Sequence, residues 1–376
     1  MVKSKMTLNF IDVFSGAGGL SCGLELAGMR CLLGIDMDKN AIETFKANHH
    51  FANVHCGSVK EITEIKLKNL VGNQQIHAVV GGPPCQGFST VGIGNPNDQR
   101  NSLFKEFLRL VKITNPYYVI IENVTGLIAK KNEKTLQSIF KLFTKMGYKL
   151  DVQVMSSENY GVPERRRRTI IIGSRINESI LFPLPDTKNI MTVGMALKNL
   201  KAPDGKIYNH DIELAKIKSA IDIQRIKCIP EGCGIRYEND EKKYFPKKLT
   251  LGVDWKNLRE NRFRRTKYQR LDRKKPGPTI MTHKNNYYHP TEHRYLTQRE
   301  AAAIQSFPHH FIFKGPLTSQ WRQIGNAVPP KLGFALGKAI LLMYAQQSEG
   351  KNKMMTTAKS DEMVVKIRKR AFVYSK

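Results

Sequence analysis

Short apolar runs rich in β-branched residues alternate with helical patterns over the first half of the chain. Seven runs predict β-strands, at 8–14, 31–36, 53–58, 77–82, 117–124, 150–157 and 169–173. Segments between them, at 20–28, 39–48, 102–113 and 134–146, have the spacing of amphipathic helices. Strands separated by helices pair in parallel, so we expect an α/β fold with a doubly wound, mostly parallel sheet. The last two strands are joined without a helix, and we expect that pair to be antiparallel.

The pattern changes after Arg175, where the sequence becomes irregular, basic and rich in Pro and Gly. We therefore expect a catalytic and cofactor-binding domain at 1–178 and a smaller irregular domain at 179–288. Helical patterns return at 296–307 and 329–345, and the second has one apolar face, made of Leu332, Leu336, Ala339, Ile340 and Met343. The segment 289–347 is predicted to return to the first domain. The tail 348–376 is polar and basic, which predicts disorder or an accessory contact.

The bulk composition describes a globular protein. Of 376 residues, 41% are hydrophobic and 25% charged, and no apolar run approaches the length of a membrane span. The N-terminus has no signal-peptide pattern, so we expect a cytoplasmic protein. Six cysteines spread through such a chain predict free thiols. Cys228 and Cys233 lack a second ligand pair, so we interpret them as ordinary thiols and expect no metal.

The net charge of +29, from 61 Lys and Arg against 32 Asp and Glu, is far above what solubility requires. Residues 225–275 hold 17 of these basic residues against 7 acidic ones. A protein with this much positive charge is suited to bind a polyanion such as a nucleic acid, because each phosphate that it neutralises releases counterions. The alternative is a proteome that is rich in lysine throughout.

The first predicted strand ends in the glycine-rich segment Asp12 to Gly19, which leads directly into a helix. Glycines let the backbone approach a ligand, and a helix N-terminus offers N–H groups. The spacing is neither that of a dinucleotide-binding GxGxxG motif nor that of a P-loop. At the end of the second strand, Asp36 could accept both hydroxyls of a ribose, although a solvated strand end is the alternative.

The most specific feature is the segment GGPPCQGFS at 81–89, after the fourth predicted strand. Two prolines restrict the backbone and place Cys85 at the carboxyl end of the strand, on the same sheet edge as the glycine turn. A thiolate there is a candidate nucleophile. The alternative is a small buried apolar residue, which is the usual fate of a free cysteine.

The fifth strand brings Glu122 to the same edge. A carboxyl beside a thiol is the pair that addition chemistry on a pyrimidine requires. Attack of the thiolate on carbon 6, with a protonated carboxyl donating to ring nitrogen 3, makes carbon 5 a nucleophile. This chemistry requires burial to raise the pKa of Glu122. The alternative is a salt bridge to the arginine run at 165–168.

In that run, Arg166 and Arg168 alternate at the start of a strand and so share one face. Their guanidinium groups could bind phosphate and a base edge together. A solvated charge run is the alternative.

In order along the chain, FSGAGGLSCG, GIDMD, GGPPCQGFS, ENV, the RRRR segment, RYLTQREAAAIQSFP and QIGNAVPP resemble the motifs of the DNA (cytosine-5)-methyltransferases, of the bacterial restriction-modification type. The resemblance covers 9–175 and 290–342. It implies the fold of S-adenosylmethionine-dependent methyltransferases, and methyl transfer to carbon 5 of cytosine in a specific double-stranded DNA sequence. The reaction would proceed through a covalent Cys85 adduct of a flipped-out base, with S-adenosylhomocysteine as the product.

The resemblance also implies roles for single residues. Cys85 matches the nucleophile, Glu122 the carboxyl on nitrogen 3, and Arg166 and Arg168 the arginines of the QxRxR motif, in which Glu164 stands here for the usual Gln. The implied cofactor residues are Phe14, Gly16, Gly18, Gly19, Leu20, Asp36, Met37, Ser58, Pro83 and Asn326. Ser89 and Arg100 lie in the segment that closes over DNA in this family. The family more often has Glu and a large apolar residue at positions 36 and 37, and Asp at position 58. Residues 180–285 correspond to its target-recognition domain.

Three other functions stay open at this point. They are an RNA cytosine methyltransferase on the same core, a catalytically silent DNA-binding protein, and an amino-group methyltransferase. The long middle segment and the PCQ sequence favour DNA, and the Cys85, Glu122 and arginine set favours an active enzyme. We expect a monomer whose partner is double-stranded DNA, with no membrane contact. A cognate restriction endonuclease would act on the same site without forming a complex.

Overall fold

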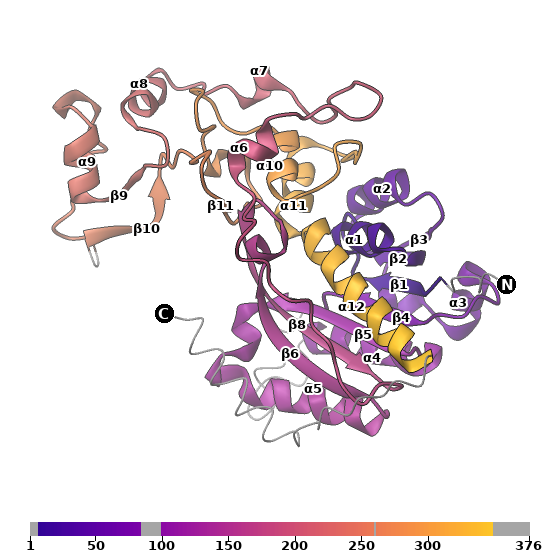
Figure 1. Ribbon diagram of the computed structural model, residues 1–376. Coiled ribbons are helices and arrows are strands. Elements are labelled where there is room, and N and C mark those ends of the chain that lie inside the picture. The colour runs from indigo at the N-terminus through magenta and orange to yellow at the C-terminus, as the bar shows by residue number, and fades with distance from the viewer. Residues whose placement is uncertain (1–6, 84–98, 259–260, 349–376) are drawn as a thin grey trace. The chain divides into compact units, whose positions relative to one another are not determined.

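The structure, a computed structural model, describes residues 7–83, 99–258 and 261–348 (Figure 1). These residues form two compact units. The first holds the described residues up to Tyr160, Arg166–Asp186 and those from Ala327, and the second holds Gly161–Arg165 and Thr187–Asn326. The segment 289–347 is therefore shared between the two units.

The first unit is built on a seven-stranded sheet with the order β3-β2-β1-β4-β5-β8-β6. Its strands are β1 (Asn9–Val13), β2 (Arg30–Asp36), β3 (Asn53–Cys56), β4 (Ala78–Gly81), β5 (Tyr118–Val124), β6 (Lys149–Ser156) and β8 (Arg167–Ser174). The pairs among the first five are parallel, while β8 runs antiparallel to both β5 and β6. The predicted mostly parallel sheet and its antiparallel last pair are confirmed. The direction reverses because residues 157–166, all described, contain no crossover α-helix.

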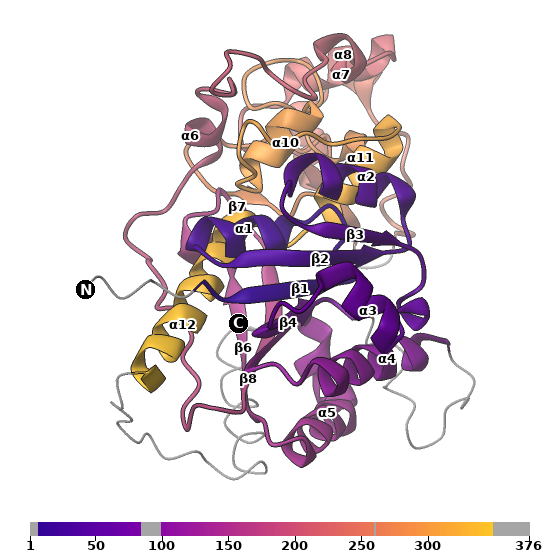
Figure 2. The same cartoon turned by 90° about the vertical axis from the view of Figure 1, so that its right-hand side faces the viewer.

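Helices cover both faces of this sheet (Figure 2). One face packs against α1 (Gly19–Ala27), α2 (Lys39–Asn48) and α12 (Pro330–Ser348). The other packs against α3 (Glu64–Val71), α4 (Gln99–Thr114) and α5 (Glu133–Lys145). The inner strands β1, β2, β4, β5 and β8 are mostly buried on both sides, whereas the edge strands β3 and β6 are only partly buried. Short 3-10 turns complete the unit: η1 (Val59–Glu61), η3 (Thr125–Ile128), η4 (Lys130–Asn132) and η5 (Ser157–Tyr160).

The last helix of the first unit, α12, packs closely against α1. Its predicted apolar face is confirmed, since all five of the residues named for it are buried. Glycines allow the approach: a Cβ on Gly23 would lie 2.2 Å from the carbonyl oxygen of Pro330, and one on Gly337 would lie 2.6 Å from the Cβ of Ala27. Residues near the C-terminus thus support the helix that follows the glycine-rich turn.

The second unit consists of short elements. Its helices are α6 (Val193–Leu197), α7 (Ile212–Ala215), α8 (Ala220–Cys228), α9 (Glu238–Tyr244), α10 (Gln298–Ile304) and α11 (Leu317–Asn326), with η6 (Lys247–Leu249) and η8 (Lys284–Asn286). Two small sheets pair β9 (Ile235–Tyr237) with β10 (Arg262–Lys267), and β7 (Glu164–Arg165) with β11 (Gly277–Pro278). A separate apolar cluster, which includes Ile226, Ile235 and Trp255, forms a core of this unit. Helices this short leave little periodicity in the sequence.

The five cysteines that the structure describes are free thiols, as expected. Among the described residues we find no helix with the length and apolarity needed to cross a bilayer.

Candidate active site

The five parallel strands of the first unit end at one edge of the sheet. Val13 at the end of β1 is in register with Gly81 on β4, and Gly81 with Ile121 on β5. A Cβ on Gly81 would lie 1.9 Å from the carbonyl oxygen of Val13, so these strand ends approach as only glycine allows. Each predicted feature lies at the end of one of these strands: the glycine turn follows β1, Asp36 ends β2, the Pro-Pro-Cys segment follows β4 in the sequence, and Glu122 lies near the end of β5. Side chains distant in the sequence therefore meet at this edge.

The turn after β1 has the backbone that the glycines predicted. Phe14, Gly16 and Gly18 have φ values of 65°, 53° and 88°, in the left-handed region. A Cβ on Gly18 would lie 2.2 Å from Nε2 of His49, whereas a Cβ on Gly16 would meet no atom within 4 Å. Gly18 is thus required by the packing of the protein itself. Gly16 instead faces open space, where a ligand can approach the backbone.

The side chain of Asp36 holds this turn against β2. Its Oδ2 accepts the backbone N–H of Gly16 at 2.8 Å, and its Oδ1 accepts that of Asp38 at 2.9 Å. Burial raises the pKa of Asp36, and these hydrogen bonds oppose the shift. The alternative of a merely solvated strand end does not describe this carboxylate. Two accepted hydrogen bonds leave part of its acceptor capacity for a ligand.

The other predicted cofactor residues differ in solvent exposure and in the contacts that their side chains make. The side chain of Met37 is 69% exposed, next to Asp36. Ser58 follows β3, and its hydroxyl caps η1 by accepting the N–H of Lys60 at 3.3 Å. Gly19 begins α1, and the buried Leu20 packs in the core.

Glu122 lies at the carboxyl end of β5 beside the loop that begins the Pro-Pro-Cys segment. Its Oε2 would lie 3.0 Å from a Cβ on Gly82, so the carboxyl packs directly against that backbone. Its Oε1 pairs with Nε of Arg168 at 2.8 Å. Burial raises the pKa of Glu122, and the positive charges of Arg168 and Arg166 oppose this shift without cancelling it. The salt bridge considered as an alternative is present, and the carboxyl nevertheless holds its proton more tightly than usual.

The two arginines of the predicted motif differ in exposure. Arg166 is only 1% exposed, and its backbone exchanges hydrogen bonds with Ser157, whose hydroxyl accepts the N–H of Arg166 at 3.0 Å. Arg168 is partly exposed and holds Glu122. Both charges act on Glu122, so the arginine run is not a solvated charge run at these positions.

Two residues of the site could not be assigned roles from the sequence. Asn123 donates from Nδ2 to the carbonyl oxygen of Pro83 at 2.9 Å, which ties the end of β5 to the start of the Pro-Pro-Cys segment. Asp12 is 1% exposed and accepts the hydroxyl of Ser21 at 2.6 Å, which joins the end of β1 to α1 across the glycine turn. Burial raises the pKa of Asp12 to about 7.

Several predicted residues are not placed at this edge by the structure. Cys85 and Ser89 lie outside the described residues. The backbone of Arg100 belongs to α4, and its side chain is not described. Asn326 is the last residue of α11, in the second unit. Among the described residues, no group of His, Cys, Asp and Glu could hold a metal ion.

The edge thus combines the open turn at Gly16, the Asp36 carboxylate that holds this turn, and the Glu122 carboxyl, whose pKa is raised and which pairs with Arg168. It can hold a polar ligand at the turn and transfer a proton at Glu122. Both lie on the edge from which the Pro-Pro-Cys segment departs.

Comparisons with known proteins show the family to which the chain belongs. The sequence model of the C-5 cytosine-specific DNA methylases matches residues 8–342. Type II methyltransferase M1.HphI of Haemophilus parahaemolyticus is 35% identical over 349 residues, which cover 91% of this chain and 89% of that protein. Type II methyltransferase M.DdeI of Desulfomicrobium norvegicum is 31% identical over 377 residues, covering 89% and 88%.

Solved structures show that the fold is shared. A crystal structure described as that of a DNA modification methyltransferase encoded within an E. coli prophage has a TM-score of 0.69 and 25% identity, covering 90% of this chain and all of that one. The S. pombe Dnmt2 methyltransferase, at 15% identity and a TM-score of 0.55 over 90% of this chain and 99% of its own, shares the fold. The chain belongs to the family of C-5 cytosine-specific DNA methylases and is a DNA (cytosine-5)-methyltransferase of the restriction-modification type.

Proposed function

We propose that this enzyme transfers a methyl group from S-adenosylmethionine to cytosine through a transient covalent bond between Cys85 and a flipped-out base. The observation that carries the proposal is the position of Glu122. This carboxyl lies against Gly82, three residues before Cys85, and burial raises its pKa. A neutral carboxyl next to a nucleophilic thiol is what activation of cytosine requires.

The chemistry follows from the electronic structure of the base. The Cys85 thiolate adds to carbon 6 while the Glu122 carboxyl gives its proton to nitrogen 3, so the ring becomes an enamine. When the cofactor is bound, carbon 5 of the enamine would take its methyl group, and the bond from that methyl to the sulfonium sulfur would break with the electron pair left on sulfur. A base removes the proton from carbon 5, the bond between Cys85 and carbon 6 breaks, and nitrogen 3 returns its proton. The ring is again aromatic and the thiolate is free.

Arg168 and Arg166 act on this cycle through charge. Both stabilise the carboxylate form of Glu122, so they make its protonated carboxyl a better proton donor to nitrogen 3. The ion pair of Arg168 also fixes the direction of the Glu122 side chain. Arg168 is therefore a positioning residue for Glu122, and Arg166 acts on the same carboxyl through its charge. The partly exposed guanidinium of Arg168 can also bind the DNA backbone or the base.

The edge of the sheet fits S-adenosylmethionine, which supplies an electrophilic methyl group when it is bound. Open space at Gly16 admits the ligand to the turn, Asp36 has acceptor capacity left for ribose hydroxyls, and exposed Met37 offers an apolar surface to the adenine. We assign the cofactor contacts to Phe14, Gly16, Gly18, Gly19, Asp36, Met37 and Pro83, with Leu20 supporting the turn from the core. Ser58 and Asn326 complete the set.

The proposed partner is double-stranded DNA. We assign target recognition to 179–288, return to the catalytic domain to 289–347, and closure over the DNA to the segment that holds Ser89 and Arg100. The base is extruded because a thiol cannot reach carbon 6 inside a stacked duplex, at a cost of a few kcal/mol. We further propose a cytoplasmic monomer whose modification protects DNA from an endonuclease of the same specificity.

Substitution of Glu122 tests the proposal. Glu122→Gln keeps the shape of the side chain but cannot transfer a proton, so methyl transfer to a cognate duplex should fall by roughly 100- to 10,000-fold. The control is Glu43→Gln, which changes an exposed carboxylate on α2 and should leave the rate unchanged. Because Glu122 must be protonated, the wild-type rate should also decline as pH rises through its pKa in the complex. A Glu122→Gln rate within tenfold of wild type would overturn the proposal.

A further inference from the structure

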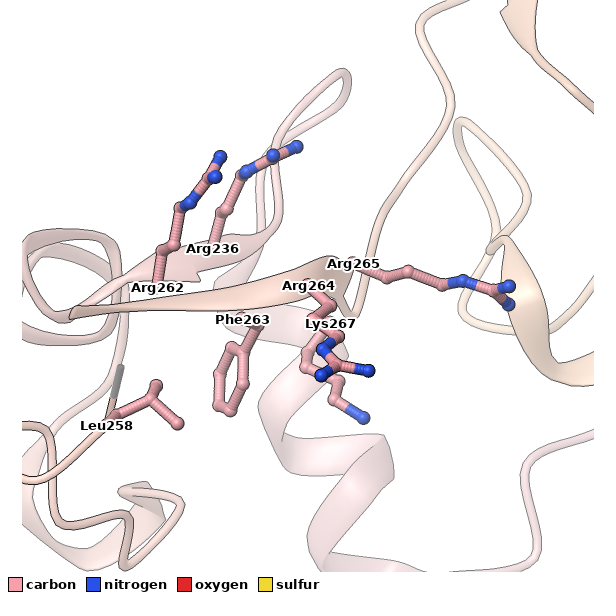
Figure 3. Close-up of a pocket in the computed structure, with 7 residues that line it drawn as sticks. All are labelled: Arg236, Leu258, Arg262, Phe263, Arg264, Arg265 and Lys267. Atoms are coloured by element: carbon pink, nitrogen blue, oxygen red, sulfur yellow. The ribbon is translucent and has the colours of Figure 1, made fainter. Parts of the chain in front are cut away.

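The second unit carries a basic pocket of about 880 Å3 on its two-stranded β9–β10 ribbon (Figure 3). Its lining residues are Arg236, Leu258, Arg262, Phe263, Arg264, Arg265 and Lys267. Five of the seven are cations, and none of these lining residues is acidic. The pocket lies within the second unit alone and shares no residue with the candidate active site.

The ribbon is fixed from its apolar side. Ile235 on β9 is fully buried in the core of the second unit, and Phe263 on β10 packs edge-on against Trp255 at 4.7 Å between ring centroids. The Asp240 carboxylate accepts the backbone N–H groups of Arg236 and Tyr237, both at 2.9 Å. This acidic group therefore binds the ribbon backbone, and the arginine side chains extend from a fixed support.

The cations fall into two groups by exposure. Arg236 and Arg262 are half-buried, and Figure 3 shows them extending in the same direction from the two strands, away from Phe263. Arg264, Arg265 and Lys267 are exposed. Within the part of the chain that the structure describes, no carboxylate forms an ion pair with these three or with Arg236, and the buried Nε of Arg236 has no hydrogen-bond partner. The charges of Arg236, Arg264 and Arg265 are therefore available to an external anion, while the ammonium of Lys267 also lies 5.7 Å from the centroid of the Phe263 ring.

We infer that the β9–β10 ribbon enters the major groove of the DNA, where Arg236 and Arg262 read guanine and Arg264, Arg265 and Lys267 bind phosphates. The major groove admits a two-stranded ribbon, and two N–H groups of one arginine side chain can donate to O6 and N7 of the same guanine. Half-buried arginines have fewer rotamers to lose on binding, which suits the selection of a base. Exposed cations suit phosphates, which carry no sequence information. The inference rests on the proposed action on duplex DNA.

The test begins with the target sequence. Plasmid DNA from cells that express the wild-type chain is mapped by bisulfite sequencing, and we expect the site to contain guanine besides the one opposite the target cytosine. Each such guanine is then replaced by 7-deazaguanine in a short duplex. This base lacks the N7 acceptor but keeps its pairing, so wild-type affinity should fall at least fivefold at a guanine that an arginine reads.

Variants identify which arginine reads which base. Arg236→Ala and Arg262→Ala should each weaken binding of the cognate duplex by roughly 5- to 150-fold and relax specificity at one base pair. Each should also become insensitive to 7-deazaguanine at its own position, because the partner of N7 has gone. The matched control, Arg264→Ala on the same strand, should stay sensitive. Its log–log slope of affinity against salt should fall by about 0.9, in all sequences alike.

The outcomes separate this inference from the proposed function. Normal methylation with no 7-deazaguanine effect at any position, or with equal effects in wild type and in both variants, would overturn guanine reading by this ribbon and leave the catalytic proposal intact. A wild-type chain that methylates no DNA would instead contradict the proposed function. A target without a further guanine would also refute the inference.

Discussion

The buried carboxyl of Asp12 makes a quantitative prediction. Asp12 is 1% exposed at the end of β1, and its pKa is raised to about 7, first by burial and then by the negative charges of Asp36 and Glu25. The hydrogen bond from Ser21 opposes the shift. From an ordinary value of 3.8, the shift is about three pKa units, or about 4 kcal/mol at 1.36 kcal/mol per unit.

The sign of the effect follows from linkage. The folded protein holds this proton more tightly than the unfolded chain, so the stabilisation is complete below about pH 4 and is lost as pH rises to about 7. Asp12→Asn keeps an oxygen that can accept the Ser21 hydroxyl and removes the titration. Relative to wild type, its free energy of unfolding should therefore rise by about 3 kcal/mol between pH 5 and pH 8.

Urea unfolding followed by circular dichroism at several pH values measures this difference. The control is Glu43→Gln, which removes one carboxylate at an exposed position on α2 and so measures the effect of losing one negative charge elsewhere in the same unit. Parallel profiles for Asp12→Asn and wild type would refute the reasoning, because they would mean that Asp12 titrates alike in the folded and unfolded chains.

Two further predictions concern the support of the site. Gly23→Ala should destabilise the fold by about 1–3 kcal/mol in thermal unfolding, because the new methyl would overlap the α12 backbone, whereas Gly126→Ala, which would meet only Val124 at 4.0 Å, should have little effect. Asn123→Ala removes the hydrogen bond to Pro83 and should lower the rate of methyl transfer roughly tenfold, about 1.4 kcal/mol. The control is Asn132→Ala, which loses a similar side-chain hydrogen bond to the carbonyl oxygen of Gly126. Equal decreases of the methyl-transfer rate in the two variants would contradict a special role for Asn123.

The sheet and its helices could be predicted because each element leaves a regular local pattern. The inner strands contain continuous apolar runs since both of their faces are buried, and α12 shows its buried face at 3.6-residue spacing. The positive φ of Gly16 and Gly18 follows from their place in a tight turn. The candidate site could be outlined for the same reason, because parallel strands bring their carboxyl ends to one edge.

The remaining features depend on contacts between distant residues. The bond from Asn123 to Pro83 spans 40 positions, and nothing near Asp12 in the sequence indicates that it is buried against Ser21. The β9–β10 ribbon could not be predicted from the sequence, because β10 is a run of cations in which Phe263 alone packs on the apolar core of the second unit. Its pairing partner is a three-residue strand, too short to show a period.

Covalent trapping tests the central claim most directly. A cognate duplex with 5-fluorocytosine at the target position is incubated with the protein and S-adenosylmethionine, and the mixture is separated on a denaturing gel. Fluorine cannot leave carbon 5 as a proton does, so the bond to Cys85 should persist and produce a stable protein–DNA species that is absent for Cys85→Ala. No trapped species in the wild type, or an equal amount in Cys85→Ala, would contradict attack by this thiol.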